Sequence, residues 1–158
     1  MITVETYFLD HGLFKSLKTF SDRPANIDHI EGSIELQIDG VTVISREIWD
    51  DLNDLWPYLV NAMEDLIIEG KEEVKLSYPD QPIYLYFRKK RGITNRVQIE
   101  FSYPETIKYE ALLDDLYAAI IGSAEIFFNR MLVLLNSSAE TAFYQDELNR
   151  VKKIRAYL

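Results

Sequence analysis

Hydrophobic and polar residues alternate along the first stretch of the chain. Residues 2–9 alternate weakly, with Ile2, Val4, Thr6 and Phe8 on one face, and predict a first strand, which Asp10-His11-Gly12 would end. The segment that follows, up to residue 26, is ambiguous. Its apolar residues have helical spacing, and Asp22-Arg23-Pro24 would break a helix there.

The clearest pattern is a β-hairpin. Residues 30–38 alternate strictly, and Asp39-Gly40 supplies the residue types of a type I′ turn. With that turn, Ile38 lies opposite Val41 and Leu36 opposite Val43. Both strands then place their apolar residues on one face of a sheet.

Residues 47–69 have the apolar spacing of an amphipathic helix. Ten apolar side chains, Trp49 and Trp56 among them, cover one side of a helical wheel, and carboxylates cover the opposite side. Pro57 predicts a kink or a helix that restarts there, because an interior proline costs about 3 kcal/mol. Gly70 would end the helix.

The rest of the chain predicts three more strands and then helices. The strands cover approximately residues 73–78, 83–89 and 96–103. Residues 105–135 are apolar over more than half of a helical wheel and indicate a core helix, with Pro104 in its first turn. Ser137-Ser138-Ala139-Glu140 is a capping box that opens a last helix.

This order of elements predicts the α+β class. We expect one domain over residues 1–158, in which an antiparallel sheet of about five to six strands packs against the Trp-rich amphipathic helix and two C-terminal helices. A chain of 158 residues with 47% hydrophobic residues can bury a substantial core.

Charge is distributed unevenly along the chain. The formal net charge is −9, and residues 1–70 hold fourteen acidic but only four basic residues. Such a charge disfavours nucleic acid and anionic membrane surfaces as partners and favours a basic protein. The plain alternative is an acidic surface that only keeps the protein soluble.

The predicted helix over residues 47–69 contains seven carboxylates and no Lys or Arg. Like charges one turn apart repel each other, so an acidic ridge of this kind predicts a binding surface for a cationic partner. We expect Tyr58 to anchor the partner, since aromatic residues dominate interface energetics. We also expect Asp50, Asp51 and Asp54 to be exposed, with both tryptophans at least partly buried beneath them. The complete predicted surface consists of Glu47, Asp50, Asp51, Asp54, Tyr58 and Asp65.

Catalytic chemistry has little support in the sequence. His11 and His29 stand alone without a ligand at helical spacing, and none of the glycine-rich nucleotide loops or serine-nucleophile motifs is present. We therefore expect no enzyme activity, no metal and no cofactor. The absence of cysteine fits a reducing compartment. No secretory signal is visible, and the most apolar window, residues 116–135, contains Glu125 and Arg130 and predicts a buried helix.

Basic residues cluster at one predicted hairpin tip. Arg88, Lys89, Lys90, Arg91 and Arg96 would either keep that tip soluble or bind an acidic patch, including the ridge of a second copy. Their proximity to Tyr84 and Tyr86 is only slightly similar to a single-strand nucleic-acid site.

The order of hairpin, Trp-rich helix and strand carries a family resemblance. A strand–Asp-Gly–strand unit leads into Ile48-Trp49-x-x-Leu52-x-x-Leu55-Trp56, and Asp80-Gln81-Pro82 precedes a later strand. Over residues 30–103 this resembles small acidic immunity proteins of bacterial polymorphic toxin systems. The resemblance implies a cytoplasmic, non-enzymatic inhibitor that binds a cognate toxin domain, often a basic nuclease. The alternative is a structural or regulatory module that self-associates, for example as a homodimer, through Trp49, Tyr58 and the sheet face.

Overall fold

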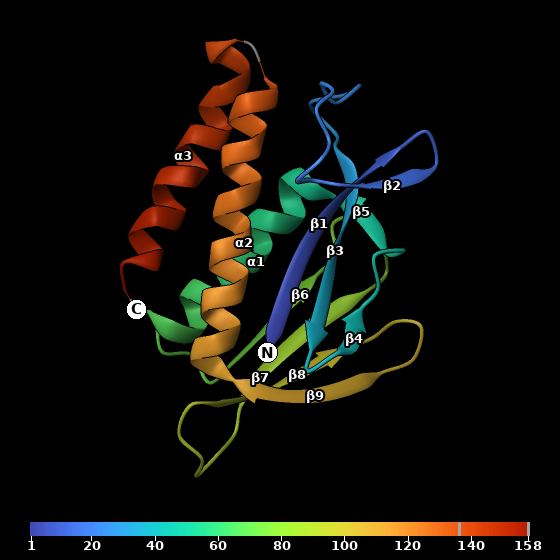
Figure 1. The fold of residues 1–158 in the computed structure, drawn as a ribbon. Coiled ribbons are helices and arrows are strands. Elements are labelled where there is room, and N and C mark those ends of the chain that lie inside the picture. Colours follow the sequence, from blue (N-terminus) through green and yellow to red (C-terminus); the bar gives the residue numbers. More distant parts are fainter. Residues whose placement is uncertain (136, 158) are drawn as a thin grey trace.

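A computed structural model, which describes residues 1–135 and 137–157, has the predicted α+β class (Figure 1). Its antiparallel strands form two sheets instead of one. The first sheet contains β1 (Ile2–Asp10), β2 (Leu13–Ser16), β3 (Glu31–Ile38), β4 (Val41–Ile44) and β5 (Trp49–Asp51). The second contains β6 (Glu73–Ser77), β7 (Tyr84–Lys89), β8 (Arg96–Phe101) and β9 (Ile107–Leu112). The helices are α1 (Leu52–Ile67), α2 (Leu113–Leu134) and α3 (Ser138–Arg155).

The first sheet has the order β2-β1-β3-β4, and β5 pairs with the first residues of β3. The predicted Asp39-Gly40 turn is present, with both residues at positive φ (49° and 82°), and Ile38 pairs with Val41 as expected. The expected pairing of Leu36 with Val43 is wrong. A bulge at Leu36/Gln37 shifts the register, so Leu36 pairs with Ile44.

The ambiguous segment after residue 12 begins with a strand. β2 pairs with β1 across a turn in which His11 and Gly12 have φ values of 50° and 77°. His11-Gly12 lacks the Asn or Asp that makes Asn-Gly and Asp-Gly the strongest hairpin signals, so its own signal is weaker.

The acidic helix begins later than predicted. Residues 49–51 form β5, so α1 starts at Leu52, with the side chain of Asp51 accepting a hydrogen bond from the N–H of Asn53 as an N-cap. Because of this late start, Pro57 falls within the second turn, and α1 continues through it without restarting.

The core helix also begins later than predicted. Ile107–Leu112 forms β9, which pairs with β8, so the helix expected from residue 105 starts at Leu113, and Pro104 lies outside it. Asn95, in the β7–β8 loop, accepts a hydrogen bond at Oδ1 from the N–H of Asp114 in the first turn of α2. The capping box of the last helix is in place, since Ser137 Oγ accepts from the N–H of Glu140.

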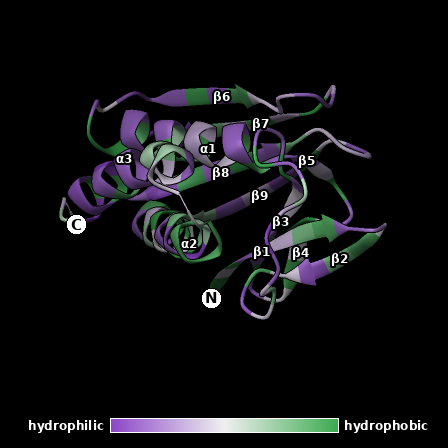
Figure 2. Cartoon of the chain, turned by 90° about the horizontal axis from the view of Figure 1, so that it is seen from above, coloured by the Kyte–Doolittle hydropathy of each residue, from purple (hydrophilic) through white to green (hydrophobic). Residues whose placement is uncertain are grey.

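One continuous hydrophobic core joins both sheets to the helices. The helices gather on one side of the molecule in Figure 1, and the strands occupy the other side. Seen from above in Figure 2, α2 is largely hydrophobic while α3 outside it is mostly hydrophilic. Trp56 is fully buried as expected, and its ring stacks on Phe127 with centroids 6.2 Å apart.

Helix α2 is long and apolar enough to cross a membrane by length and composition. The core helix of a soluble protein meets the same criterion. Ten residues of α2 are buried, and α2 packs against β1, α1 and α3.

Gly32 permits a close approach between β1, β3 and the start of α1. A Cβ atom at this position would overlap the carbonyl oxygen of Tyr7 and the side chain of Leu52.

We therefore predict that Gly32→Ala lowers the free energy of unfolding by about 1–3 kcal/mol in urea denaturation, because the backbone must shift to accommodate the added methyl group. The matched control is Gly122→Ala in α2, where the added Cβ meets nothing within 4 Å. That variant should gain about 0.5–1 kcal/mol from helix propensity. Equal effects at the two sites would contradict this account of Gly32.

Candidate functional site

The structure divides the predicted acidic ridge into two parts. Asp50 and Asp51 are buried, at 0% and 6% exposure, so the expectation that they lie exposed beside Asp54 is wrong. Asp54 and Tyr58 are exposed on α1. Asp65 is half-buried and pairs with Lys71 at 3.0 Å. Glu47 is exposed in the turn before β5 and does not belong to the helix.

Strand pairing is the reason why two ridge carboxylates are buried. On a helix, residues 50, 51 and 54 would share one face. In the structure, Asp50 pairs with Gly32 and Asp51 with Glu31 in the β3–β5 ladder. The backbone is therefore extended up to Asp51, and Asp50 is directed into the protein.

The buried carboxylate of Asp50 holds the loop between β6 and β7. It accepts hydrogen bonds from the backbone N–H groups of Asp51 at 2.6 Å, Asp80 at 3.1 Å and Gln81 at 3.1 Å. Gln81 returns a side-chain hydrogen bond to the carbonyl of Trp49 at 3.2 Å. This bonding compensates the burial of a charge, so Asp50 has a structural function.

His29 stands among three carboxylates. Its Nδ1 lies 2.9 Å from Oδ2 of Asp51, and its Nε2 lies 3.8 Å from Asp80 and 3.9 Å from Glu31. The hydrogen bond to Asp51 is the main cause that raises the pKa of His29, and the charges of Asp51, Asp80 and Glu31 add to it. The ring is half-exposed, so a positive charge on it faces solvent as well as the carboxylates.

Asp54 completes this cluster. Partial burial is the largest cause that raises the pKa of its carboxyl group, and repulsion from Asp51, Asp80 and Asp50 contributes as well. His29 opposes the shift. We use the name His29 cluster for the following residues: His29, Glu31, Asp51, Asp54 and Asp80.

The His29 cluster is strongly anionic. Among residues 1–135 and 137–157, no Lys or Arg side chain comes within 4.0 Å of its carboxylates. Three of the four carboxylates therefore have the titratable His29 as their only close cationic partner in that part of the chain, and Asp54 has no close cationic partner there. The arrangement can attract a cation or bind a proton.

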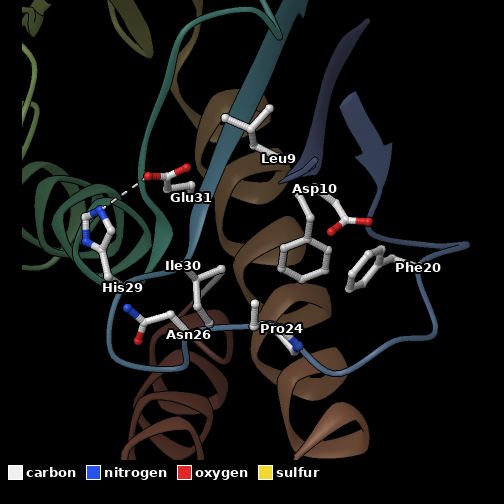
Figure 3. Close-up of a pocket in the computed structure, with 10 residues that line it drawn as sticks. Leu9, Asp10, Phe20, Pro24, Asn26, His29, Ile30 and Glu31 are labelled. Carbon is white, nitrogen blue, oxygen red and sulfur yellow. Dashed lines mark ion pairs between the residues drawn. The ribbon is translucent and has the colours of Figure 1, made fainter. Parts of the chain in front are cut away.

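One pocket includes His29 and Glu31, and a second lies beside Gln81, the neighbour of Asp80. The first, of about 270 Å³, extends from His29 and Glu31 to the rings of Phe8 and Phe20 and to Pro24 (Figure 3). The second, of about 290 Å³, lies between Trp49 and Tyr103, whose side chains remain 37% and 51% exposed. The exposed aromatic side chains of Trp49 and Tyr103 therefore lie in the second pocket, next to Gln81, whereas Phe8 and Phe20 of the first pocket are buried.

The described residues do not provide a set of metal ligands. In the described part of the chain, no group of three or more His, Asp or Glu side chains is placed to hold a metal ion. The expectation of no metal and no enzyme activity remains a prediction.

Two of the five basic residues at the predicted tip form ion pairs within the described part of the chain. Arg88 pairs with Glu73 at 3.8 Å and with Glu100 at 3.5 Å, and Lys90 forms an ion pair with Glu110. The tip lies at one end of the molecule, and the start of α1 lies toward the other (Figure 1).

Sequence reasoning missed His29, Glu31 and Asp80 as parts of one site. His29 and Glu31 lie at the start of β3, whereas Asp80 follows β6. The β3–β5 pairing and the hydrogen bonds of Asp50 bring Asp80 to the other two residues. Asp80-Gln81-Pro82 precedes a predicted strand, but nothing in the sequence links it to His29.

Replacing Asp50 tests its structural function. Asp50→Asn removes the charge and places an amide among three N–H donors, so we predict a loss of about 1–3 kcal/mol of unfolding free energy. The backbone amides of Asp80 and Gln81 should also exchange faster with deuterium. Asp146→Asn, at an exposed position in the middle of α3, is the control and should leave both measurements unchanged. Undisturbed protection of residues 80 and 81 would contradict the assignment.

The raised pKa of His29 makes the stability of the fold depend on pH. Because the pKa of His29 is raised above its ordinary 6.5, its proton stabilises the folded state below pH 6.5, and this stabilisation is lost as pH rises through the folded-state pKa. The difference in unfolding free energy between the wild type and His29→Gln should therefore be larger at pH 6 than at pH 8. Titration of the His29 ring by NMR gives the folded-state pKa directly. A midpoint at or below 6.5 would contradict the prediction.

No family model, no curated protein and no solved structure matches this chain. The resemblance to immunity proteins therefore rests on the sequence pattern of residues 30–103, and the site is interpreted from its own geometry.

Proposed function

We propose that this chain is a non-enzymatic protein-binding module of the immunity type. It inhibits a basic toxin domain of the nuclease kind, in the cytoplasm, by covering it with the anionic surface around the start of α1. The surface consists of the His29 cluster together with Asp28 and Tyr58.

One observation carries this proposal. Four carboxylates at the start of α1 are exposed: Asp28, Glu31, Asp54 and Asp80. None of them forms an ion pair with Lys or Arg in residues 1–135 and 137–157. Repulsion between them opposes folding, so a surface of this kind is well suited to a cationic partner that relieves the repulsion on binding.

The surface also offers an anchor beside its charges. Tyr58 lies one helical turn after Asp54 on the same face of α1, and its side chain is 39% exposed. Exposed charges mainly accelerate encounter, whereas a buried aromatic side chain slows dissociation. We propose Tyr58 as the anchor and the carboxylates as its charged surround.

Self-association is the alternative function. It would place the basic tip of one copy on the acidic surface of another. The ion pairs of Arg88 and Lys90 within the chain make the tip a weaker cationic partner, so the toxin-binding proposal has more support.

The test uses the protein encoded by the neighbouring gene, purified as a complex or in separate parts. We expect Glu31→Lys with Asp80→Lys to slow association about tenfold or more and to flatten its dependence on salt. Tyr58→Ala should instead raise the dissociation rate about tenfold, which corresponds to about 1.4 kcal/mol. Association and dissociation rates are measured by surface-based binding kinetics.

The control for charge is Glu72→Lys with Glu105→Lys, two exposed carboxylates outside the proposed surface. Circular dichroism checks that each variant is folded. If the Glu31/Asp80 variant and the control change the kinetics equally, net charge and not this surface governs binding. If the neighbouring protein is neither bound nor inhibited, the toxin-binding proposal is wrong.

A further inference from the structure

A third pocket, of about 410 Å³, lies beside the His29 cluster between α1 and α3. It is formed by the segment before β3 and by the first turns of both helices. Its lining residues are Ile27, Asp28, Asn53, Asp54, Ala139, Glu140, Phe143 and Tyr144. Asp54 belongs to both the pocket and the His29 cluster, so the two form one continuous surface.

Three carboxylates line the pocket, and no Lys, Arg or His does. Asp28 and Asp54 are exposed. One oxygen of Glu140 is bonded to Arg23 from the long loop after β2. Its other oxygen, Oε2, is buried and accepts no hydrogen bond from the described residues. Glu140 therefore adds negative charge behind the pocket, partly offset by Arg23, while Asp28 and Asp54 present the carboxylate oxygens that a ligand can reach.

Aromatic rings supply the rest of the pocket. The ring of Phe143 is 44% exposed and packs edge-on against Tyr144, with centroids 5.1 Å apart. Burial raises the pKa of Tyr144 to about 12, so its hydroxyl stays protonated and donates to Oδ1 of Asn53 at 2.6 Å. This bond joins α3 to α1 and fixes the width of the pocket. Phe143 remains free to stack on a ligand.

The surroundings of Asp54 disfavour the charged form of its carboxyl group. The carboxyl group of Asp54 is disfavoured as an anion by partial burial and by the nearby Asp51, Asp80 and Asp50. A cation bound beside it would offset both effects.

We infer that the pocket between α1 and α3 receives an arginine side chain of the basic partner. A guanidinium group is planar, stacks on an aromatic face, and presents several N–H donors at once. It can therefore lie on Phe143 while it bonds Asp54 and Asp28. This inference rests on the proposed function and adds a specific recognition element to it.

The experiment uses three capped tripeptides, acetyl-Gly-Arg-Gly-amide and its Lys and Gln counterparts, titrated into the full chain. Two-dimensional NMR follows the backbone amides. The arginine peptide should bind in the millimolar range and should shift residues 27–28, 53–54 and 139–144 in a saturable manner. The lysine peptide should bind several-fold more weakly, and the glutamine peptide should not bind.

Substitutions then test each group of the pocket. Asp54→Asn with Asp28→Asn should weaken binding of the arginine peptide about fivefold or more, since both charge-assisted hydrogen bonds are lost. Phe143→Ala should weaken it about two- to fivefold. Each single Asp→Asn substitution changes only an exposed side chain and keeps the test valid if the double variant is unstable. Asp146→Asn, exposed on α3 outside the pocket, is the matched control.

The outcomes separate this inference from the proposed function. Undiminished binding by the pocket variants, equal binding of the lysine peptide, or shifts elsewhere in the chain would overturn the arginine site. The kinetics with the neighbouring protein depend on Glu31, Asp80 and Tyr58 and are read independently. If the chain inhibits the neighbouring protein but does not bind the arginine peptide, only the arginine site is wrong. If the chain binds the arginine peptide but does not inhibit the neighbouring protein, the proposed toxin partner is wrong.

Discussion

The buried carboxylate of Asp50 holds together the two sheets on which the candidate site depends. It belongs to β5 of the first sheet and accepts hydrogen bonds from the backbone of Asp80 and Gln81, which connect β6 and β7 of the second. The next residue, Asp51, caps α1 and binds His29. Two adjacent side chains thus fix the junction of both sheets, the start of a helix and the orientation of a histidine.

The same junction concentrates negative charge at the surface. Asp50 and Asp51 are satisfied by N–H groups and by His29, but their charges still act on Asp54, where they disfavour the anion. Glu31 and Asp80 are brought within 4 Å of one imidazole. The negative charges of the buried Asp50 and Asp51 therefore add to those of the exposed carboxylates. This is the physical basis for an anionic surface that a basic partner can complement.

The helices frame this surface and supply its apolar part. The stack of Trp56 on Phe127 holds α1 against α2, and the hydrogen bond from Tyr144 to Asn53 holds α3 against the first turn of α1. Tyr58 and Phe143 are left exposed on either side. Charged and aromatic side chains therefore lie near each other on helices that are packed together, an arrangement that is typical of protein-binding surfaces.

The sequence by itself determined the α+β class, the Asp39-Gly40 hairpin, the burial of Trp56, the capped last helix and the acidic character of the first 70 residues. These features depend on local periodicity, turn chemistry and composition, which neighbouring residues carry. Only the tertiary structure decided that residues 49–51 are a strand, because their pairing with β3 overrides a helical pattern that continues across them. That pairing buries Asp50 and Asp51 and brings Glu31, His29 and Asp80 together. β9 was missed for a similar reason, since its pairing with β8 competes with an apolar spacing that also suits a helix. The site is therefore a product of long-range strand pairing, which one helical wheel cannot represent.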